Sequence, residues 1–143
     1  MILCLDTNTV VQALPEHHTF HPILEAWVAG NVTWAVSTPI LLEYQEVITR
    51  LSGPSRWRKL TRLMDLAEIT SGNLLRVTPT FNFQVVTVDP DDNIFTDCAI
   101  TASADFLITE DHDFAPLRTA GYKPQPISPQ EFILRFIDSG KLT

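Results

Sequence analysis

Acidic residues in this chain stand directly behind short apolar runs. The run Ile2–Leu5 leads straight into Asp6, and the run Phe106–Ile108 leads into a segment that contains Asp111. Apolar runs of this length, separated by longer helical patterns, are typical of the buried parallel strands of an α/β sheet. Ligands of such sheets bind outside the carboxyl ends of the strands. Carboxylates that converge there repel one another, so the pattern predicts a site for a hard divalent cation such as Mg²⁺.

Length and composition indicate a single domain that spans residues 1–143. The chain has 143 residues, of which 45% are apolar, and this is enough to bury a sizeable core. Its apolar runs fall short of the roughly 18–20 residues that cross a bilayer. No basic region precedes the apolar start, so a secretory signal is not expected and a cytoplasmic location is predicted. In that reducing compartment Cys4 and Cys98 are expected to be buried free thiols rather than a disulfide.

The alternation of strand-like and helix-like segments predicts a three-layer α/β/α domain around a central parallel sheet. Strands are expected over Ile2–Leu5, Thr33–Val36, 74–77 and Phe106–Ile108, with a short edge strand at Gln125–Ile127. Helices are expected over residues 9–14, 22–29, 39–51, 57–67, 93–103 and 129–137. Thr38 is assigned as the N-cap of the third helix, and Ser128 as the N-cap of the last one.

Three side chains from the first third of the sequence are candidates for the cation site. Asp6 follows a strand directly, so its carboxylate is expected to project from the carboxyl edge of the sheet. Asn8 is placed to orient Asp6 by a hydrogen bond. Glu43 lies on a helix, where a lone glutamate is usually solvated, but its neighbours Ile40 and Val47 indicate a partly buried face.

Acids also crowd the start of the helix expected over residues 93–103. Asp92 has two interpretations there, as an ordinary N-cap worth about 1 kcal/mol or as a metal ligand. Capping needs one acid, whereas Asp89 and Asp91 stand beside it. Asp97 lies further along, among apolar neighbours, where an unpaired carboxylate is costly to bury. Asp97 is therefore either on the exposed face of the helix or a metal ligand, and the sequence leaves both open.

The segment behind the fourth expected strand supplies the remaining candidates. Asp111 follows that strand closely, and Asp113 comes two residues later. Thr109 precedes them and is placed to hydrogen-bond a neighbouring carboxylate or a ligand water. Strand-end acids combined with helix-start acids make a Mg²⁺ or Mn²⁺ site the leading interpretation.

Basic residues are concentrated in one stretch of an otherwise acidic chain. The net charge of −7 argues against non-specific nucleic-acid binding by bulk electrostatics. Half of the basic residues nevertheless fall within residues 50–62, and they are candidates for contact with RNA phosphates: Arg50, Arg56, Arg58, Lys59 and Arg62. Trp57 lies among them, and either base stacking or inward packing of its ring is compatible with the sequence.

Four short motifs follow one another along nearly the whole chain. They are LDTN at residues 5–8, TPILLEY at 38–44, DPDDN at 89–93 with DCA at 97–99, and ADFLITED at 104–111. In this order and spacing the motifs resemble the signatures of PIN-domain ribonucleases. The likeness is greatest to a bacterial branch of PIN-family toxins, which is similar to the VapC-type toxins of toxin–antitoxin pairs.

The resemblance implies a catalytic quartet of acids that holds Mg²⁺ or Mn²⁺: Asp6, Glu43, Asp92 and Asp111. Asp97 matches an extra acid frequent in this branch, and Asp113 is a further candidate ligand. The implied reaction is metal-assisted hydrolysis of RNA phosphodiester bonds. The implied partners are RNA, a cognate antitoxin and a second copy in a homodimer, with no membrane. Glu110 departs from the family, which often has a basic or small residue there.

Two alternatives to a ribonuclease remain open at this point. A phosphohydrolase or a receiver-type α/β domain would use Asp6 as phosphoacceptor, but the haloacid-dehalogenase pattern has a second aspartate where this chain has Asn8. A non-catalytic module that keeps the fold and binds RNA or protein is the other alternative. It would bind RNA without binding the metal.

Overall fold

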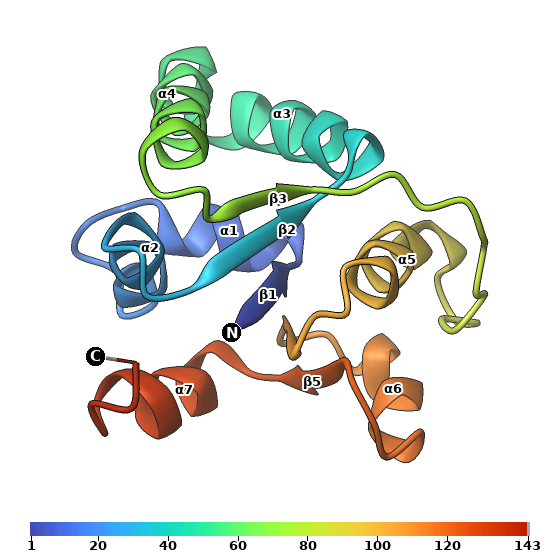
Figure 1. The fold of residues 1–143 in the computed structure, drawn as a ribbon. Helices are drawn as coiled ribbons and strands as arrows, with labels where there is room; N and C mark the ends of the chain where they lie inside the picture. The colour runs from blue at the N-terminus through green and yellow to red at the C-terminus, as the bar shows by residue number, and fades with distance from the viewer. Residues whose placement is uncertain (143) are drawn as a thin grey trace.

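The computed structural model describes residues 1–142 and contains a five-stranded sheet in the order β3-β2-β1-β4-β5 (Figure 1). All neighbouring strands run parallel. The strands are β1 (Ile2–Leu5), β2 (Thr33–Val36), β3 (Leu74–Arg76), β4 (Phe106–Ile108) and β5 (Gln125–Ile127). The predicted α/β class and parallel sheet are confirmed, and β3 is one residue shorter than expected.

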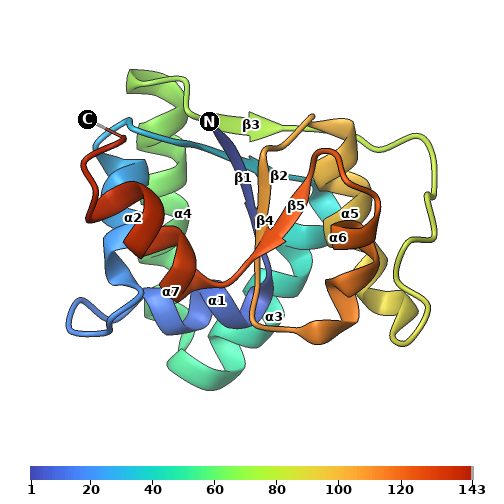
Figure 2. The same cartoon turned by 90° about the horizontal axis from the view of Figure 1, so that it is seen from below.

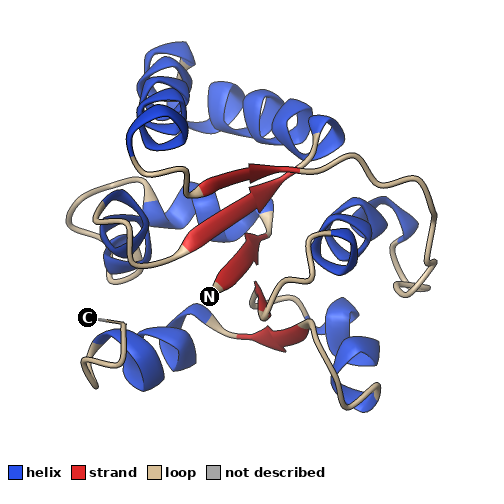
Figure 3. Ribbon diagram, in the orientation of Figure 1, coloured by secondary structure: helices blue, strands red, loops and turns tan. Residues whose placement is uncertain are grey.

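Helices cover both faces of the sheet. Among the described residues these are α1 (Thr7–Ala13), α2 (His21–Val28), α3 (Thr38–Ser52), α4 (Pro54–Thr70), α5 (Asn93–Thr101), α6 (Ala115–Thr119) and α7 (Pro129–Phe132). Helices α2, α4 and α7 lie on one side of the strands, and α5 and α6 lie on the other (Figures 1 and 2). Figure 3 shows the strands as the middle layer of this sandwich. Over the described part of the chain, no helix is both long and apolar enough to cross a membrane.

The direction of the chain across the sheet reverses at the central strand β1. From β1 the chain moves outward to β2 and β3, and it then returns to the other side of β1 to form β4 and β5. Because crossovers in parallel sheets are right-handed, this reversal puts the connecting helices on opposite faces. Ligands of doubly wound sheets bind at such a switch point, outside the carboxyl ends of the strands. Asp6 follows β1 and Asp111 lies shortly after β4, so both stand at this point.

Aromatic side chains join the sheet to its helices around β2. The ring of Trp34 in β2 lies 5.0 Å from that of Trp27 in α2 and 5.8 Å from that of Tyr44 in α3, measured between centroids. All three residues are almost completely buried. The Tyr44 hydroxyl also donates a hydrogen bond to the backbone oxygen of Leu5, the last residue of β1. The aromatic contacts therefore fix α3 against the strand end from which the site is built.

The two cysteines lie inside the domain. Cys4 of β1 and Cys98 of α5 are free thiols and fully buried. A hydrogen bond with Cys98, followed by burial, raises the pKa of Cys4 well above its usual range. The Cys4 thiol therefore stays protonated at neutral pH, the state in which a thiol is least reactive.

Asn73 ties α2 to the edge of the sheet through its buried side chain. Its Nδ2 donates to the backbone oxygens of Trp27, at 2.6 Å, and Val32, at 3.1 Å. Asn73→Leu keeps the side-chain volume but deprives two buried carbonyls of these donors, so the free energy of unfolding should fall by about 2–4 kcal/mol. Urea unfolding at pH 7 measures the loss against Asn31→Leu, at an exposed position. Equal losses in both variants would contradict this role for Asn73.

Some helix boundaries differ from the expected ones for local reasons. Ser37 has extended backbone angles and is the N-cap of α3, so Thr38 is already helical. Helix α1 starts at Thr7, two residues before the expected start, because Asp6 is its N-cap and accepts a hydrogen bond from the Thr9 N–H. The last helix continues over Ile133–Ile137 as a π-helix. Helix α6 and a 3-10 turn at Pro90–Asp92 were not expected, since such short elements give no periodic pattern.

Candidate metal centre

Asp6 is held rigidly at the end of β1. Its backbone N–H donates to the backbone oxygen of Ile108 in β4 at 3.2 Å. Its carboxylate accepts hydrogen bonds from the Thr9 N–H, at 2.8 Å, and from the Thr109 hydroxyl. Burial raises the pKa of Asp6 above its usual value, even though the bonds from Thr109 and Thr9 act in the opposite direction. Asp6 thus presents an oriented carboxylate whose charge the protein compensates only in part.

Thr109 links Asp6 to the acids that follow β4. Its hydroxyl donates to Asp6 and accepts from the Asp111 N–H at 2.9 Å. The Asp111 carboxylate accepts in turn from the Asp113 N–H at 2.9 Å. Hydrogen bonds of this kind orient metal ligands from the layer behind them. The predicted hydrogen bond from Thr109 to a neighbouring carboxylate is therefore confirmed, and that carboxylate is Asp6.

Glu43 reaches the same end of the sheet from α3. Its carboxylate is half-buried and accepts a hydrogen bond from the Thr7 hydroxyl at the start of α1. Tyr44, the next residue, bonds to the end of β1, so Glu43 is positioned by contacts on both sides. Sequence reasoning missed Thr7. Its place directly behind Asp6, where a hydroxyl can reach the strand end, is the signal that could have revealed it.

Asp92 stands at the N-terminus of α5 without capping it. Its side chain makes no capping hydrogen bond to α5, so the ordinary N-cap interpretation does not hold. Burial raises its pKa from 3.8 to about 7, and four acids add to the effect, in decreasing order Asp89, Asp111, Glu43 and Asp113. The effect of like charges on a carboxyl group is to favour its neutral form, so these four acids disfavour the negative charge of Asp92. Acids from segments far apart in the sequence thus act on one carboxyl group.

Three of these acids offer oxygens close enough to share an ion. Single side-chain oxygens of Asp89, Asp92 and Asp113 all lie within 4.8 Å of one another. Oxygen ligands sit roughly 2.0–2.6 Å from Mg²⁺ or Ca²⁺, so two ligands on opposite sides of one ion are about 4–5 Å apart, which is the scale of this separation. The all-oxygen donor set fits Mg²⁺ or Mn²⁺. Asp89 was not predicted as a ligand, because it looks like a turn residue, and its carboxylate does accept from the Asp91 N–H at 3.2 Å.

A cleft of about 420 Å³ opens beside the strand ends. Its walls consist of Asp6, Asn8, Thr9, Val11, Gln12, Glu110 and Asp111. Asn8, predicted to orient Asp6, is exposed in this wall, and Thr9 and Thr109 supply the hydrogen bonds to Asp6 in its place. The exposed carboxylate of Glu110 accepts from Gln130 Nε2 at 3.2 Å and adds negative charge to the mouth of the cleft.

Asp97 is not one of the three clustered acids. It is buried on α5, and its carboxylate accepts a hydrogen bond from the Phe83 N–H at 3.0 Å. The exposed-face interpretation is therefore wrong. The bond ties the segment before α5 to that helix and supplies part of the solvation that a buried carboxylate needs.

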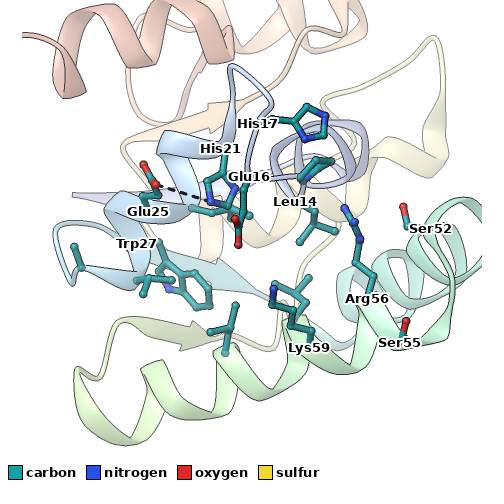
Figure 4. Close-up of a pocket in the computed structure, with 16 residues that line it drawn as sticks. Leu14, Glu16, His17, His21, Glu25, Trp27, Ser52, Ser55, Arg56 and Lys59 are labelled. Atoms are coloured by element: carbon teal, nitrogen blue, oxygen red, sulfur yellow. Dashed lines mark ion pairs between the residues drawn. The ribbon is translucent and has the colours of Figure 1, made fainter.

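The basic stretch of residues 50–62 is divided between two environments. Arg56 and Lys59 of α4 line a pocket of about 1020 Å³, and Glu16 lines the same pocket (Figure 4). None of the acids of the metal centre lines this pocket. Trp57 is partly buried and packs against the core, so inward packing of its ring is what the fold adopts. The remaining cations of the stretch lie outside this pocket and are exposed, as Lys59 also is: Arg50, Arg58 and Arg62.

Comparisons with known proteins agree with this architecture. A chain of VapBC2 from Rickettsia felis, whose crystal structure holds a DNA fragment from their promoter, superimposes with a TM-score of 0.57 at 18% identity, covering 90% of this chain and 98% of that one. FitAcB from Neisseria gonorrhoeae gives a TM-score of 0.57 at 18% identity, with coverages of 91% and 99%. At this identity the two structures show a shared fold. A search of curated proteins finds no significant match. The family model of the PIN domain matches residues 3–113, and the chain belongs to the PIN-domain family.

Proposed function

We propose that this protein is a metal-dependent endoribonuclease that hydrolyses RNA phosphodiester bonds at the acidic centre. The observation that carries the proposal is the gathering of acids at one end of the sheet. Asp6 and Asp111 line one cleft, and Asp89, Asp92 and Asp113 offer oxygens within 4.8 Å of one another. Membership of the PIN-domain family supports nuclease chemistry. The choice of RNA rests on the resemblance of the four motifs to PIN-domain ribonucleases.

The residues that would hold Mg²⁺ or Mn²⁺ are Asp6, Glu43, Asp92 and Asp111, with Asp89 and Asp113 beside them. When bound, the ion supplies Lewis acidity and an activated water. Asp6 contributes a carboxylate that Thr9 and Thr109 keep aimed at the cleft. Without a cation the negative charge of these carboxylates repels the phosphodiester anion. A bound cation neutralises that charge, so RNA should bind at the site only when the metal is present.

Cleavage of labelled RNA by the purified protein tests the proposal. We expect cleavage with Mn²⁺ or Mg²⁺ and none with EDTA, alongside Mn²⁺ binding measured by calorimetry. RNA binding without Mn²⁺ binding would support the non-catalytic module instead. A stable acyl phosphate on Asp6 would support the phosphohydrolase.

We also propose that the protein is the toxin of a toxin–antitoxin pair and that the pocket between α2 and α4 receives an apolar helix of the antitoxin. The resemblance to VapC-type toxins and the fold shared with VapBC2 support the pairing. The pocket has an apolar floor: Leu14, Leu24, Trp27, Leu60 and Leu63. Its rim carries Arg56 and Lys59 on one element and Glu16 and Glu25 on others. An apolar centre with a charged rim is typical of protein–protein sites.

Reversing the charges of the pocket rim tests the antitoxin proposal. The Arg56→Glu/Lys59→Glu variant should raise roughly tenfold or more the concentration of the proposed antitoxin that is needed to inhibit RNA cleavage. Cleavage without antitoxin should be unchanged. Arg118→Glu is the matched control, since Arg118 is an exposed cation on α6 outside the pocket. Reduced cleavage by the free variant would instead assign Arg56 and Lys59 to RNA contact.

A further inference from the structure

The segment between β3 and α5 exposes two aromatic rings. Residues 77–89 run along the outer side of α5 (Figures 1 and 2). Phe81 and Phe83 in this segment are 64% and 39% exposed, and their ring centroids are 4.9 Å apart. The twelve residues 77–88 carry no charged side chain, although the protein has a net charge of −7. A neutral aromatic surface therefore lies beside a strongly acidic helix start.

Hydrogen bonds fix this segment to α5. The Asn93 side chain accepts from the Val86 N–H at 2.8 Å and donates to the Val86 backbone oxygen at 2.9 Å. One turn further along α5, Asp97 accepts from the Phe83 N–H. Val86 is buried, and Gln84, between the two attachments, has a φ of 53°, a conformation that non-glycine residues rarely adopt. The segment is therefore a strap with a defined path, and the rings stand at a fixed position.

The strap connects the rings to the helix that begins at the acidic cluster. It ends at Asp89, one of the three clustered acids, and its first attachment, Asn93, directly follows Asp92. The second attachment, Asp97, lies five residues beyond Asp92, which corresponds to about 7.5 Å along the helix axis. The Phe83 N–H is therefore bonded to a residue about one and a half turns along α5 from Asp92, so one bound strand can reach both the rings and the cluster.

We propose that Phe81 and Phe83 form a platform on which unpaired bases of the RNA substrate stack while an adjacent phosphate lies at the metal centre. The inference rests on the proposed ribonuclease function and names the residues that select single-stranded RNA. Proteins that bind single strands stack bases on aromatic side chains, and bases in a duplex are not free to do so. Stacking needs no positive charge, so it suits an acidic surface. Asn82 and Gln84 beside the rings add hydrogen-bonding groups for base edges.

Removal of the rings tests the platform. Kd for a short labelled single-stranded RNA is measured with the Asp6→Asn protein in Mn²⁺, so that the strand is not cut. We expect Phe81→Ala/Phe83→Ala to raise Kd roughly tenfold or more, and Phe81→Trp to keep the wild-type Kd. Ile69→Ala, at an apolar position on α4 that is 83% exposed, is the matched control and should not change Kd. With abasic RNA the ring variants should lose nothing.

Cleavage kinetics separate the platform from the ribonuclease proposal. In the otherwise wild-type protein the ring variants should raise KM with kcat little changed. If the wild type cleaves RNA and the double alanine variant matches it in Kd and KM, the platform is wrong and the nuclease stands. If the wild type neither binds nor cleaves RNA, both are wrong. Weakened antitoxin binding or self-association with an unchanged Kd for RNA would assign the rings to a protein contact and overturn the platform.

Discussion

Asp6→Asn is expected to lower metal-dependent RNA cleavage by roughly 100-fold or more while the protein stays folded. The substitution keeps an oxygen that can accept from the Thr9 N–H, so the cap of α1 survives. It removes the charge that burial disfavours at this position, so stability should not fall. What is lost is the negative charge with which Asp6 is proposed to bind the ion at the switch point. Initial rates over a range of Mn²⁺ concentrations measure the effect.

Two further variants sharpen this test. Thr109→Val removes the hydroxyl that orients Asp6 and Asp111 without removing a ligand, and it should cost about 10- to 100-fold in activity or metal affinity. Asp65→Asn makes the same chemical change as Asp6→Asn at an exposed position on α4 and should leave cleavage unchanged. Cleavage by Asp6→Asn at the rate of Asp65→Asn would exclude Asp6 from the reaction.

The sheet was predictable because its strands have a strong local signal. Ile2–Leu5 and Phe106–Ile108 are apolar runs that end at polar residues, and a buried parallel strand needs little more. The handedness of the crossovers decides which face each helix covers but not the order of the strands, so the pairing of β1 with β4, which brings their ends together, is known from the structure alone. Asp6 and Asp111 were predicted as site residues because each lies behind an apolar strand-like run, at the edge where parallel strands end.

The rest of the centre depends on contacts that no local pattern encodes. Asp89 has the sequence context of a turn residue, and its place near Asp92 and Asp113 results from how the loop before α5 folds back. Asp97 has an apolar context that fits either a ligand or a satisfied buried acid, and its bond to Phe83 joins residues 14 apart across an irregular loop. Such a loop has no periodicity from which its path could be predicted.

The metal-free protein should become less stable as pH rises, and Asp92→Asn should relieve much of this loss. The pKa of Asp92 is about 7 in the folded protein against an ordinary 3.8, so the folded state binds more protons than the unfolded state between these values. Stability therefore falls as pH rises through this window and is flat above it. Because Asp92 is partly exposed and screened, the loss is about 1–2 kcal/mol rather than the full value of the shift. In EDTA at pH 8, Asp92→Asn should have a Tm higher by roughly 3 °C or more.

Saturating Mn²⁺ should reverse this order of stability. An ion that binds the folded state stabilises it by RT ln(1 + [L]/Kd), and binding neutralises the charges that destabilise the wild type. Asp92→Asn lacks a ligand and should gain much less, so the wild type becomes the more stable protein in Mn²⁺. Thermal unfolding of both proteins at pH 8, with EDTA or Mn²⁺, measures the crossing, and Asp65→Asn should follow the wild type in both conditions. The predicted reversal would be contradicted if the wild type were already more stable than Asp92→Asn in EDTA, because Asp92 would then stabilise the fold without a metal. This reversal distinguishes a carboxylate that stabilises the protein only when a cation is bound from one that stabilises the fold without a cation.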